Sequence, residues 1–234
     1  MAYVGKNDLD HALADYSEAA RLHPDSIENE KAGAQLYTLH GHTHRVGYKD
    51  YDRAIADYSE AINLDPTNGR LYYDRGMAYV EKGDLDCAAA DYKEAISRLT
   101  ESININPGYA DHYYDRGNAY AMMGDADRAI SDFTETIGRN LKHAGAYHFR
   151  GAVWAAKGEY DQAVADYSEA IRLYPERTDV ERLSKAGAYG DRARAYKKKS
   201  DPYGFWGRFR PPARQWWARS IADYREGRKL LERG

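Results

Sequence analysis

The clearest pattern of apolar and polar positions lies between residues 144 and 177. Apolar residues recur at helical spacing over 147–157, a Gly-Glu break follows, and a second amphipathic run covers 160–173. Pro175 ends this second run, because proline cannot continue a helix. The pattern predicts two antiparallel helices that share one apolar face.

The same pattern recurs along the chain, and an aromatic residue in a frame of the type Ala-Asp-Tyr-x-Glu-Ala marks the second helix of each copy. Two of the five intervals between these aromatics are 34 residues, and the other three are 42, 41 and 57 residues. One hairpin cannot bury its apolar face alone, so the copies are expected to stack into one core. The six marker residues are Tyr16, Tyr58, Tyr92, Phe133, Tyr167 and Tyr224.

The regular fifth copy carries a set of spaced residues that identifies a family. Counted from Ala144 as position 1, they are Tyr147, Gly151, Trp154, Ala163, Tyr167, Ala170 and Pro175, at positions 4, 8, 11, 20, 24, 27 and 32. On these residues the chain resembles the tetratricopeptide repeat (TPR) family. The resemblance covers nearly all of residues 1–201 and 217–231. It implies an all-α, right-handed solenoid of about six antiparallel helix hairpins.

Three copies depart from the regular length, and the first is truncated. In copy 2 we expect most of the addition to precede the first helix, at 27–33, with one more residue near Gly47. In copy 3 the proline, Pro107, arrives seven residues late. Seven residues make nearly two helical turns, which predicts an extended second helix from Asp86 to about Asn104.

Copy 6 departs most from the pattern. It has Ala193 for the usual glycine and Gly227 for the usual alanine, and an insertion of about 15 residues, Pro202 to Trp216, separates its helices. Charge changes here as well: residues 178–234 carry 15 Lys and Arg against 7 Asp and Glu, whereas residues 1–177 carry 19 against 30. We therefore divide the chain into TPR-like repeats 1–5 over 1–177 and a basic, Trp-rich C-terminal region over 178–234, with the divergent sixth repeat and a capping helix.

The composition favours a cytoplasmic location. Cys87 is the single cysteine, which excludes an intramolecular disulfide. No apolar run approaches the length of a membrane span, and the first residues show no basic and apolar signal segment. We also find no phosphate-binding glycine loop and no recognisable nucleophile frame. The chain is therefore expected to be no enzyme and to use neither a cofactor nor a small-molecule substrate.

A polar pair recurs within the repeats. The family pattern has an aliphatic residue at position 7, whereas copies 3 to 6 have arginine there and aspartate at position 23. These positions face each other across the hairpin, so we predict an ion pair in each of these copies. Copy 2 has His40 at position 7 yet retains Asp57, which left open a role for the aspartate toward a neighbour or a helix end. The predicted pairs are Arg75 with Asp91, Arg116 with Asp132, Arg150 with Asp166, and Arg192 with Asp223.

The resemblance implies a non-catalytic scaffold for protein–protein interaction. In this family the first helices line a concave groove, and the mapped positions here are mostly aromatic, thioether or small. Such a lining suits a peptide segment of a protein partner with apolar anchors. The candidate partner-binding residues are Tyr73, Met77, Tyr114, Asn118, Met122 and His148.

The insertion near the C-terminus provides a candidate secondary surface, in which aromatic and basic residues alternate. We expect it to fold as a cap over the last repeat or to contact a protein. Two alternatives remain open: self-association into a homo-oligomer through the open N-terminal end and the basic C-terminal region, and binding of nucleic acid or an anionic membrane through Lys197–Arg219, which is less favoured. The surface residues are Phe205, Trp206, Arg208, Arg210, Trp216 and Trp217.

Three histidines alternate in copy 2: His40, His42 and His44. Two imidazoles one helical turn apart can share a transition-metal ion. No cysteine or third ligand stands out in the sequence, and His40 and His44 occupy the packing positions 7 and 11. We therefore expect core and surface roles for these histidines and no metal site.

Overall fold

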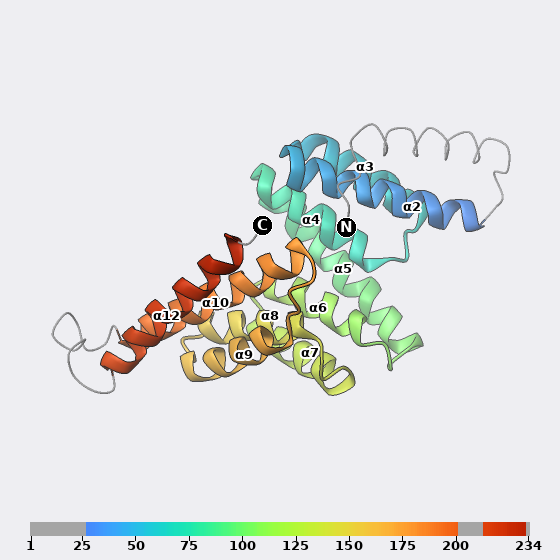
Figure 1. The fold of residues 1–234 in the computed structure, drawn as a ribbon. Coiled ribbons are helices and arrows are strands. Elements are labelled where there is room, and N and C mark those ends of the chain that lie inside the picture. Colours follow the sequence, from blue (N-terminus) through green and yellow to red (C-terminus); the bar gives the residue numbers. More distant parts are fainter. Residues whose placement is uncertain (1–26, 201–212, 233–234) are drawn as a thin grey trace. The chain divides into compact units, whose positions relative to one another are not determined.

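The computed structural model describes residues 27–200 and 213–232, and all regular elements in these ranges are helices (Figure 1). The truncated first copy and most of the insertion of copy 6 lie outside the described residues. The chain divides into two compact units between Pro107 and Gly108. Each unit is described by itself.

Unit 1 contains two described hairpins, numbered after their copies. Hairpin 2 consists of α2 (Ile27–His42), the π-helix η1 (Thr43–Tyr48) and α3 (Tyr51–Leu64). Hairpin 3 consists of α4 (Gly69–Lys82) and α5 (Leu85–Ile105). The two hairpins stack through α3 and α4, and the buried Tyr58 of α3 packs with Ala78 of α4.

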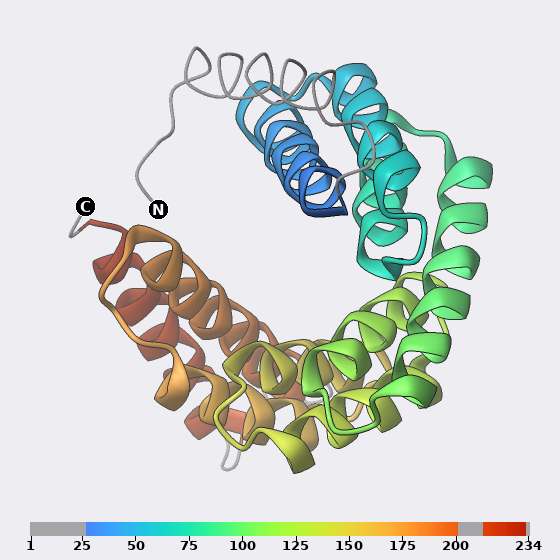
Figure 2. The same ribbon diagram turned by 90° about the vertical axis from the view of Figure 1, so that its right-hand side faces the viewer.

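Unit 2 contains three hairpins, in which each first helix packs on its partner, and the second helices of hairpins 4 and 5 pack on the next hairpin. Both ribbon views show α10 and α12 side by side, although part of the insertion separates them in sequence (Figure 2). The helices are α6 (Ala110–Met122) and α7 (Ala126–Arg139) in hairpin 4, α8 (Ala144–Ala156) and α9 (Tyr160–Leu173) in hairpin 5, and α10 (Asp179–Ser200) and α12 (Ala213–Leu231) in hairpin 6.

This arrangement confirms the predicted all-α class and the stacking of helix hairpins. The direct packing of α10 on α9 means that residue 178, where the charge changes, is not a break in the packing. The long helix predicted in copy 3 is also confirmed. It is α5, which has 21 residues and keeps Leu99 and Ile103 buried in its added turns.

One contact recurs inside the hairpins, between the glycine at position 8 and the aromatic ring at position 24. A Cβ atom on Gly76 would lie 2.8 Å from Tyr92 Cε1, and one on Gly151 would lie 3.0 Å from the Tyr167 ring. Both rings are 2% exposed. Position 8 is therefore small because the partner helix fills that space with a ring.

Hairpin 6 departs from this geometry. With Ala193 at position 8, the aromatic residue at position 24, Tyr224, is 45% exposed. A second close approach lies at Gly227, where an added Cβ would lie 3.2 Å from the Ala186 carbonyl oxygen. Position 27 is therefore small in this hairpin because the backbone of the partner helix lies close to it.

The expectation for copy 2 was wrong in one respect. Residues 27–33 do not precede the first helix but form the first turns of α2. Glu28, Glu30, Lys31 and Ala32 are good helix formers, so a polar stretch here lengthens the helix. The single extra residue near Gly47 falls within η1, and a π-helix accommodates an inserted residue without ending the helix.

Candidate functional site

The predicted Arg–Asp pairs form in all four hairpins. In each, the arginine Nε and one terminal nitrogen donate to the two carboxylate oxygens, at 2.7–2.9 Å. The arginine side chains are 16–21% exposed and the aspartates 6–10%. These are bidentate, largely buried pairs, which are stronger than exposed ones.

The structure adds a link between hairpins that the sequence did not predict. The remaining terminal nitrogen of Arg150 donates to Thr134 Oγ1 of the preceding hairpin at 2.9 Å, and that of Arg192 donates to Ser168 Oγ at 2.8 Å. In unit 1, Arg75 makes the same contact with Ser59 at 3.0 Å. Each of these arginines therefore holds two successive hairpins together, which favours a structural role over ligand binding.

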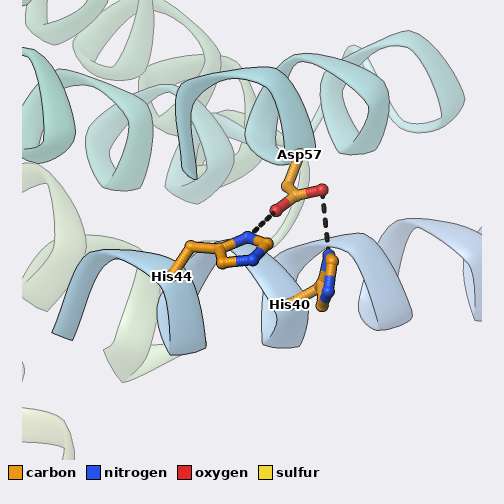
Figure 3. A group of neighbouring side chains, drawn as sticks. All are labelled: His40, His44 and Asp57. Carbon is orange, nitrogen blue, oxygen red and sulfur yellow. Dashed lines mark hydrogen bonds and ion pairs between the residues drawn. The ribbon is translucent and has the colours of Figure 1, made fainter. Parts of the chain in front are cut away.

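In hairpin 2 two histidines take the place of the arginine. His40 Nδ1 lies 3.1 Å from Asp57 Oδ1, and His44 Nδ1 lies 2.7 Å from Oδ2 (Figure 3). No third metal-ligating residue stood out in the sequence, and in the structure Asp57 lies between the two histidines. The aspartate serves its own hairpin, as it does in hairpins 3 to 6.

Two of the six candidate partner-binding residues belong to unit 1. Tyr73 and Met77 are half-buried and lie four residues apart on α4, which places them on one face of this helix. The Tyr73 ring lies 5.8 Å from the ring of Tyr92, and the Arg70 guanidinium lies 5.8 Å from the Tyr73 centroid. Tyr73 is therefore partly covered by its neighbours in hairpin 3 and only partly exposed at the surface of unit 1.

The other four belong to unit 2. On α6, Tyr114 is half-buried, Met122 is 41% exposed, and Asn118 is only 7% exposed. His148 lies half-buried on α8. Asn118 thus presents little surface, whereas Met122 presents the most of the three.

Tyr114 and His148 are joined by an aromatic residue that the sequence analysis missed. The Phe149 ring lies 6.0 Å from that of Tyr114 and 5.8 Å from that of His148, and Phe149 is 43% exposed. A signal was present, because this position holds aspartate in copies 3, 4 and 6 and phenylalanine only here. The three rings form a continuous aromatic strip from α6 to α8.

His148 is held in place by polar contacts at both ring nitrogens. Its Nδ1 lies 3.3 Å from the Tyr174 hydroxyl, and its Nε2 lies 2.8 Å from Asp191 Oδ2. Burial alone would raise the pKa of Asp191, but the hydrogen bond from His148 and the charge of Arg194 lower it below its usual range. This carboxylate therefore stays ionised between two nitrogen donors.

Beside His148, unit 2 contains an open hollow of about 340 Å³ between α8, α9 and α10. Three alanines of α8 form one side, and they occupy positions expected to face the groove. Arg194 and Lys198 come from α10 of hairpin 6. The lining residues are Ala152, Ala155, Ala156, Tyr160, Tyr167, Asp191, Arg194, Ala195 and Lys198.

The secondary surface is only partly described. Phe205, Trp206, Arg208 and Arg210 lie outside the described residues, as does the side chain of Trp217. Trp216 is half-buried, and Lys199 Nζ lies 4.5 Å from the centre of its ring. Lys199 also pairs with Asp161 of α9, so this end of α12 is tied to the fifth and sixth hairpins.

Comparisons with known proteins agree with this architecture. A model described as TPR repeat matches residues 49–83 and 76–124, and one described as tetratricopeptide repeat matches residues 114–178. Together these matches cover more than half of the chain. A comparison with curated proteins gave no match.

Solved structures with a similar fold have low sequence identity to this chain. The structure of BtubC from P. vanneervenii has a TM-score of 0.66 at 13% identity and covers 97% of this chain and 89% of its own. The structure of MamA has a TM-score of 0.51 at 23% identity and covers 82% and 95%. The Cut9–Hcn1 structure has a TM-score of 0.59 at 14% identity and covers 95% and 43%. At these identities the likeness concerns the fold alone.

Proteins built from these repeats are typically non-catalytic interaction scaffolds. Among the described helices, none is both long and apolar enough to cross a membrane. The repeat spacing, the hairpin geometry and the matches to the family models agree, and this chain belongs to the tetratricopeptide repeat family.

Proposed function

We propose that this protein is a non-catalytic scaffold that binds a peptide segment of a partner protein. The observation that carries the proposal is the open hollow in unit 2, which the chain's own described side chains leave unfilled. Its volume of about 340 Å³ can accommodate a few side chains of a peptide. The aromatic strip of Tyr114, Phe149 and His148 continues beside it.

The lining of the hollow indicates what kind of peptide fits. Ala152, Ala155 and Ala156 keep the α8 side flat, so a peptide backbone can approach closely. Tyr160 supplies apolar contact and Lys198 supplies positive charge, whereas Arg194 is paired with Asp191 of the same lining. The best match is a segment with a small apolar anchor followed by an acidic residue, which basic side chains can bind.

The aromatic strip and the exposed methionine would provide the second part of the site. Phe149 and Met122 have exposed apolar surface, which rigid aromatic and adaptable thioether groups use well in protein contacts. Tyr73 and Met77 would present the same chemistry on unit 1, as a surface considered separately. Asn118 would contribute least, because it is 7% exposed.

The test selects short peptides from a random display library against the full chain and measures their affinities by fluorescence polarisation. Ala156→Glu places a larger, negatively charged side chain in the hollow at an exposed position. We expect this change to weaken binding by about tenfold or more, which is about 1.4 kcal/mol. Peptides that bind wild type and Ala156→Glu equally would contradict the proposal.

The matched control is Ala165→Glu on α9. Ala165 is also an exposed helical alanine, but it does not line the hollow. Its substitution introduces the same charge and volume and should leave affinity unchanged. Self-association and binding of nucleic acid or an anionic membrane remain alternative predictions, for which much of the relevant surface lies outside the described residues.

A further inference from the structure

The side chains around Asp57 differ chemically from those around the equivalent aspartates. In hairpins 3 to 6 a guanidinium donates two N–H groups to the carboxylate, and in hairpin 2 two imidazoles contact the same two oxygens. A guanidinium has no acceptor and stays protonated in proteins. A neutral imidazole carries a lone pair and is a common metal ligand. The replacement therefore turns an ion pair into a set of three metal-ligating groups.

The geometry of these groups is compact. The candidate ligand atoms of His40, His44 and Asp57 all lie within 4.8 Å of one another, and no other such group of three was found among the described residues. In a tetrahedral zinc site the bonds are about 2.0–2.1 Å long, so ligand atoms lie about 3.3 Å apart. His40 Nδ1 and His44 Nδ1 now lie 3.1 and 2.7 Å from the two different oxygens of Asp57, so binding an ion requires the three side chains to adjust around a single carboxylate oxygen.

The local backbone also favours a built site. His40 lies in the last turn of α2, whereas His44 lies in η1, and π-helical turns occur often at functional sites. Figure 3 shows both rings directed from the α2–η1 segment toward the carboxylate on α3. The ring centroids are 4.3 Å apart. Two neighbouring turns and the facing helix thus converge on one point.

Burial is graded across the cluster. The His44 side chain is 4% exposed, whereas those of His40 and Asp57 are 12% and 13% exposed. The inner ligand is therefore fixed by packing, and the outer two leave a path for an ion. Water could complete the coordination on this side, as in sites with three protein ligands.

We propose that hairpin 2 binds one divalent transition-metal ion, of the zinc type, through His40, His44 and Asp57. Two nitrogens and one carboxylate oxygen suit Zn²⁺, Co²⁺, Ni²⁺ and Cu²⁺, whereas Mg²⁺ and Ca²⁺ prefer oxygen ligands alone. The bound ion would cross-link the α2–η1 segment to α3, replacing the hydrogen bonds of the metal-free state. The site is independent of the proposed peptide-binding hollow, which lies in unit 2.

The experiment uses the full chain without a histidine tag, freed of metal by a chelator that is then removed. Zinc chloride is titrated by calorimetry, and cobalt chloride is titrated by visible absorption, which reports tetrahedral coordination. We expect one ion per chain for wild type. His40→Arg, which restores the residue type of hairpins 3 to 6, should weaken zinc binding by at least about tenfold. Because the other hairpins tolerate arginine here, this variant is expected to fold.

The matched control is His42→Arg. His42 is an exposed histidine of the same helix and is no member of the cluster, so its substitution should leave affinity and stoichiometry unchanged. Zinc should raise the melting temperature of wild type and His42→Arg but not that of His40→Arg, because a ligand stabilises the state that binds it.

A second variant, Asp57→Asn, keeps the side-chain volume and removes the carboxylate charge, and it should also weaken zinc binding. Circular dichroism establishes that each variant is folded before titration. The proposal is overturned if wild type binds no zinc, or if folded His40→Arg and folded Asp57→Asn both bind it as tightly as wild type. Equal losses in His40→Arg and His42→Arg would overturn it as well.

Discussion

Hairpins 2 and 5 satisfy an aspartate at the same position in different ways. In hairpin 5 a single residue, Arg150, contacts both oxygens of Asp166 and also reaches the preceding hairpin. In hairpin 2, contact with Asp57 takes two residues, and one of them, His44, replaces the aromatic residue at position 11. The aspartate is the constant element, and its nitrogen donors can change. The donors differ in one chemical respect. An imidazole can bind a metal ion through a ring nitrogen, whereas a guanidinium cannot.

The largest effect is expected from breaking the arginine pair. Asp166→Asn leaves the Arg150 guanidinium, which is 18% exposed, without its counter-charge. Breaking a buried ion pair by removing one partner costs about 3 kcal/mol, because the remaining charge stays partly desolvated. Urea unfolding followed by circular dichroism should show this loss.

A control for Asp166→Asn is available on the same helix. Asp161 pairs with Lys199 but is 81% exposed, so Asp161→Asn should cost at most about 0.5 kcal/mol. Equal destabilisation by the two variants would mean that burial of the pair is not what makes Asp166 important.

A smaller effect is expected from the link between hairpins 5 and 6. Ser168→Ala removes the oxygen that accepts a hydrogen bond from Arg192 at 2.8 Å. The donor is charged and half-buried, so the cost should be about 1.5 kcal/mol in urea unfolding.

Ser184→Ala provides the comparison for Ser168→Ala. Both serines donate to the carbonyl oxygen four residues earlier, but of the two only Ser168 accepts a hydrogen bond from an arginine within the described part of the chain. We expect Ser184→Ala to change stability by less than about 0.5 kcal/mol. If Ser168→Ala and Ser184→Ala cost the same stability, the hydrogen bond between hairpins 5 and 6 contributes nothing measurable to the free energy of unfolding.

The contacts that could be predicted from the sequence are those set by counting residues within one hairpin. Positions 7 and 23 face each other wherever the register is regular, so the partner of Arg150 could be named in advance. The length of α5 followed in the same way, because seven added residues preserve its buried face. The contact of Arg150 with Thr134 could not be predicted, because it depends on how one hairpin stacks on the previous one.

The cluster in hairpin 2 was missed for a different reason. The residue count assigned His44 to the packing position 11, and His44 is indeed buried there. The count does not say which polar group a buried histidine contacts, and in the structure that group is Asp57. A polar residue at a packing position is therefore where the sequence register says least about contacts.

The smallest effect is expected in hairpin 2 itself. In the presence of a chelator, Asp57→Asn should cost about 1 kcal/mol, roughly a third of the cost of Asp166→Asn. The reason is that an imidazole, unlike a guanidinium, has an uncharged form, so loss of the carboxylate need not leave a buried charge unpaired, and the asparagine amide can still hydrogen-bond to the rings. Urea unfolding of both variants in the same buffer measures the ratio. Equal costs would mean that the histidines act as charged partners of the carboxylate, as the arginines do. The two hairpins would then differ only in the geometry of these contacts.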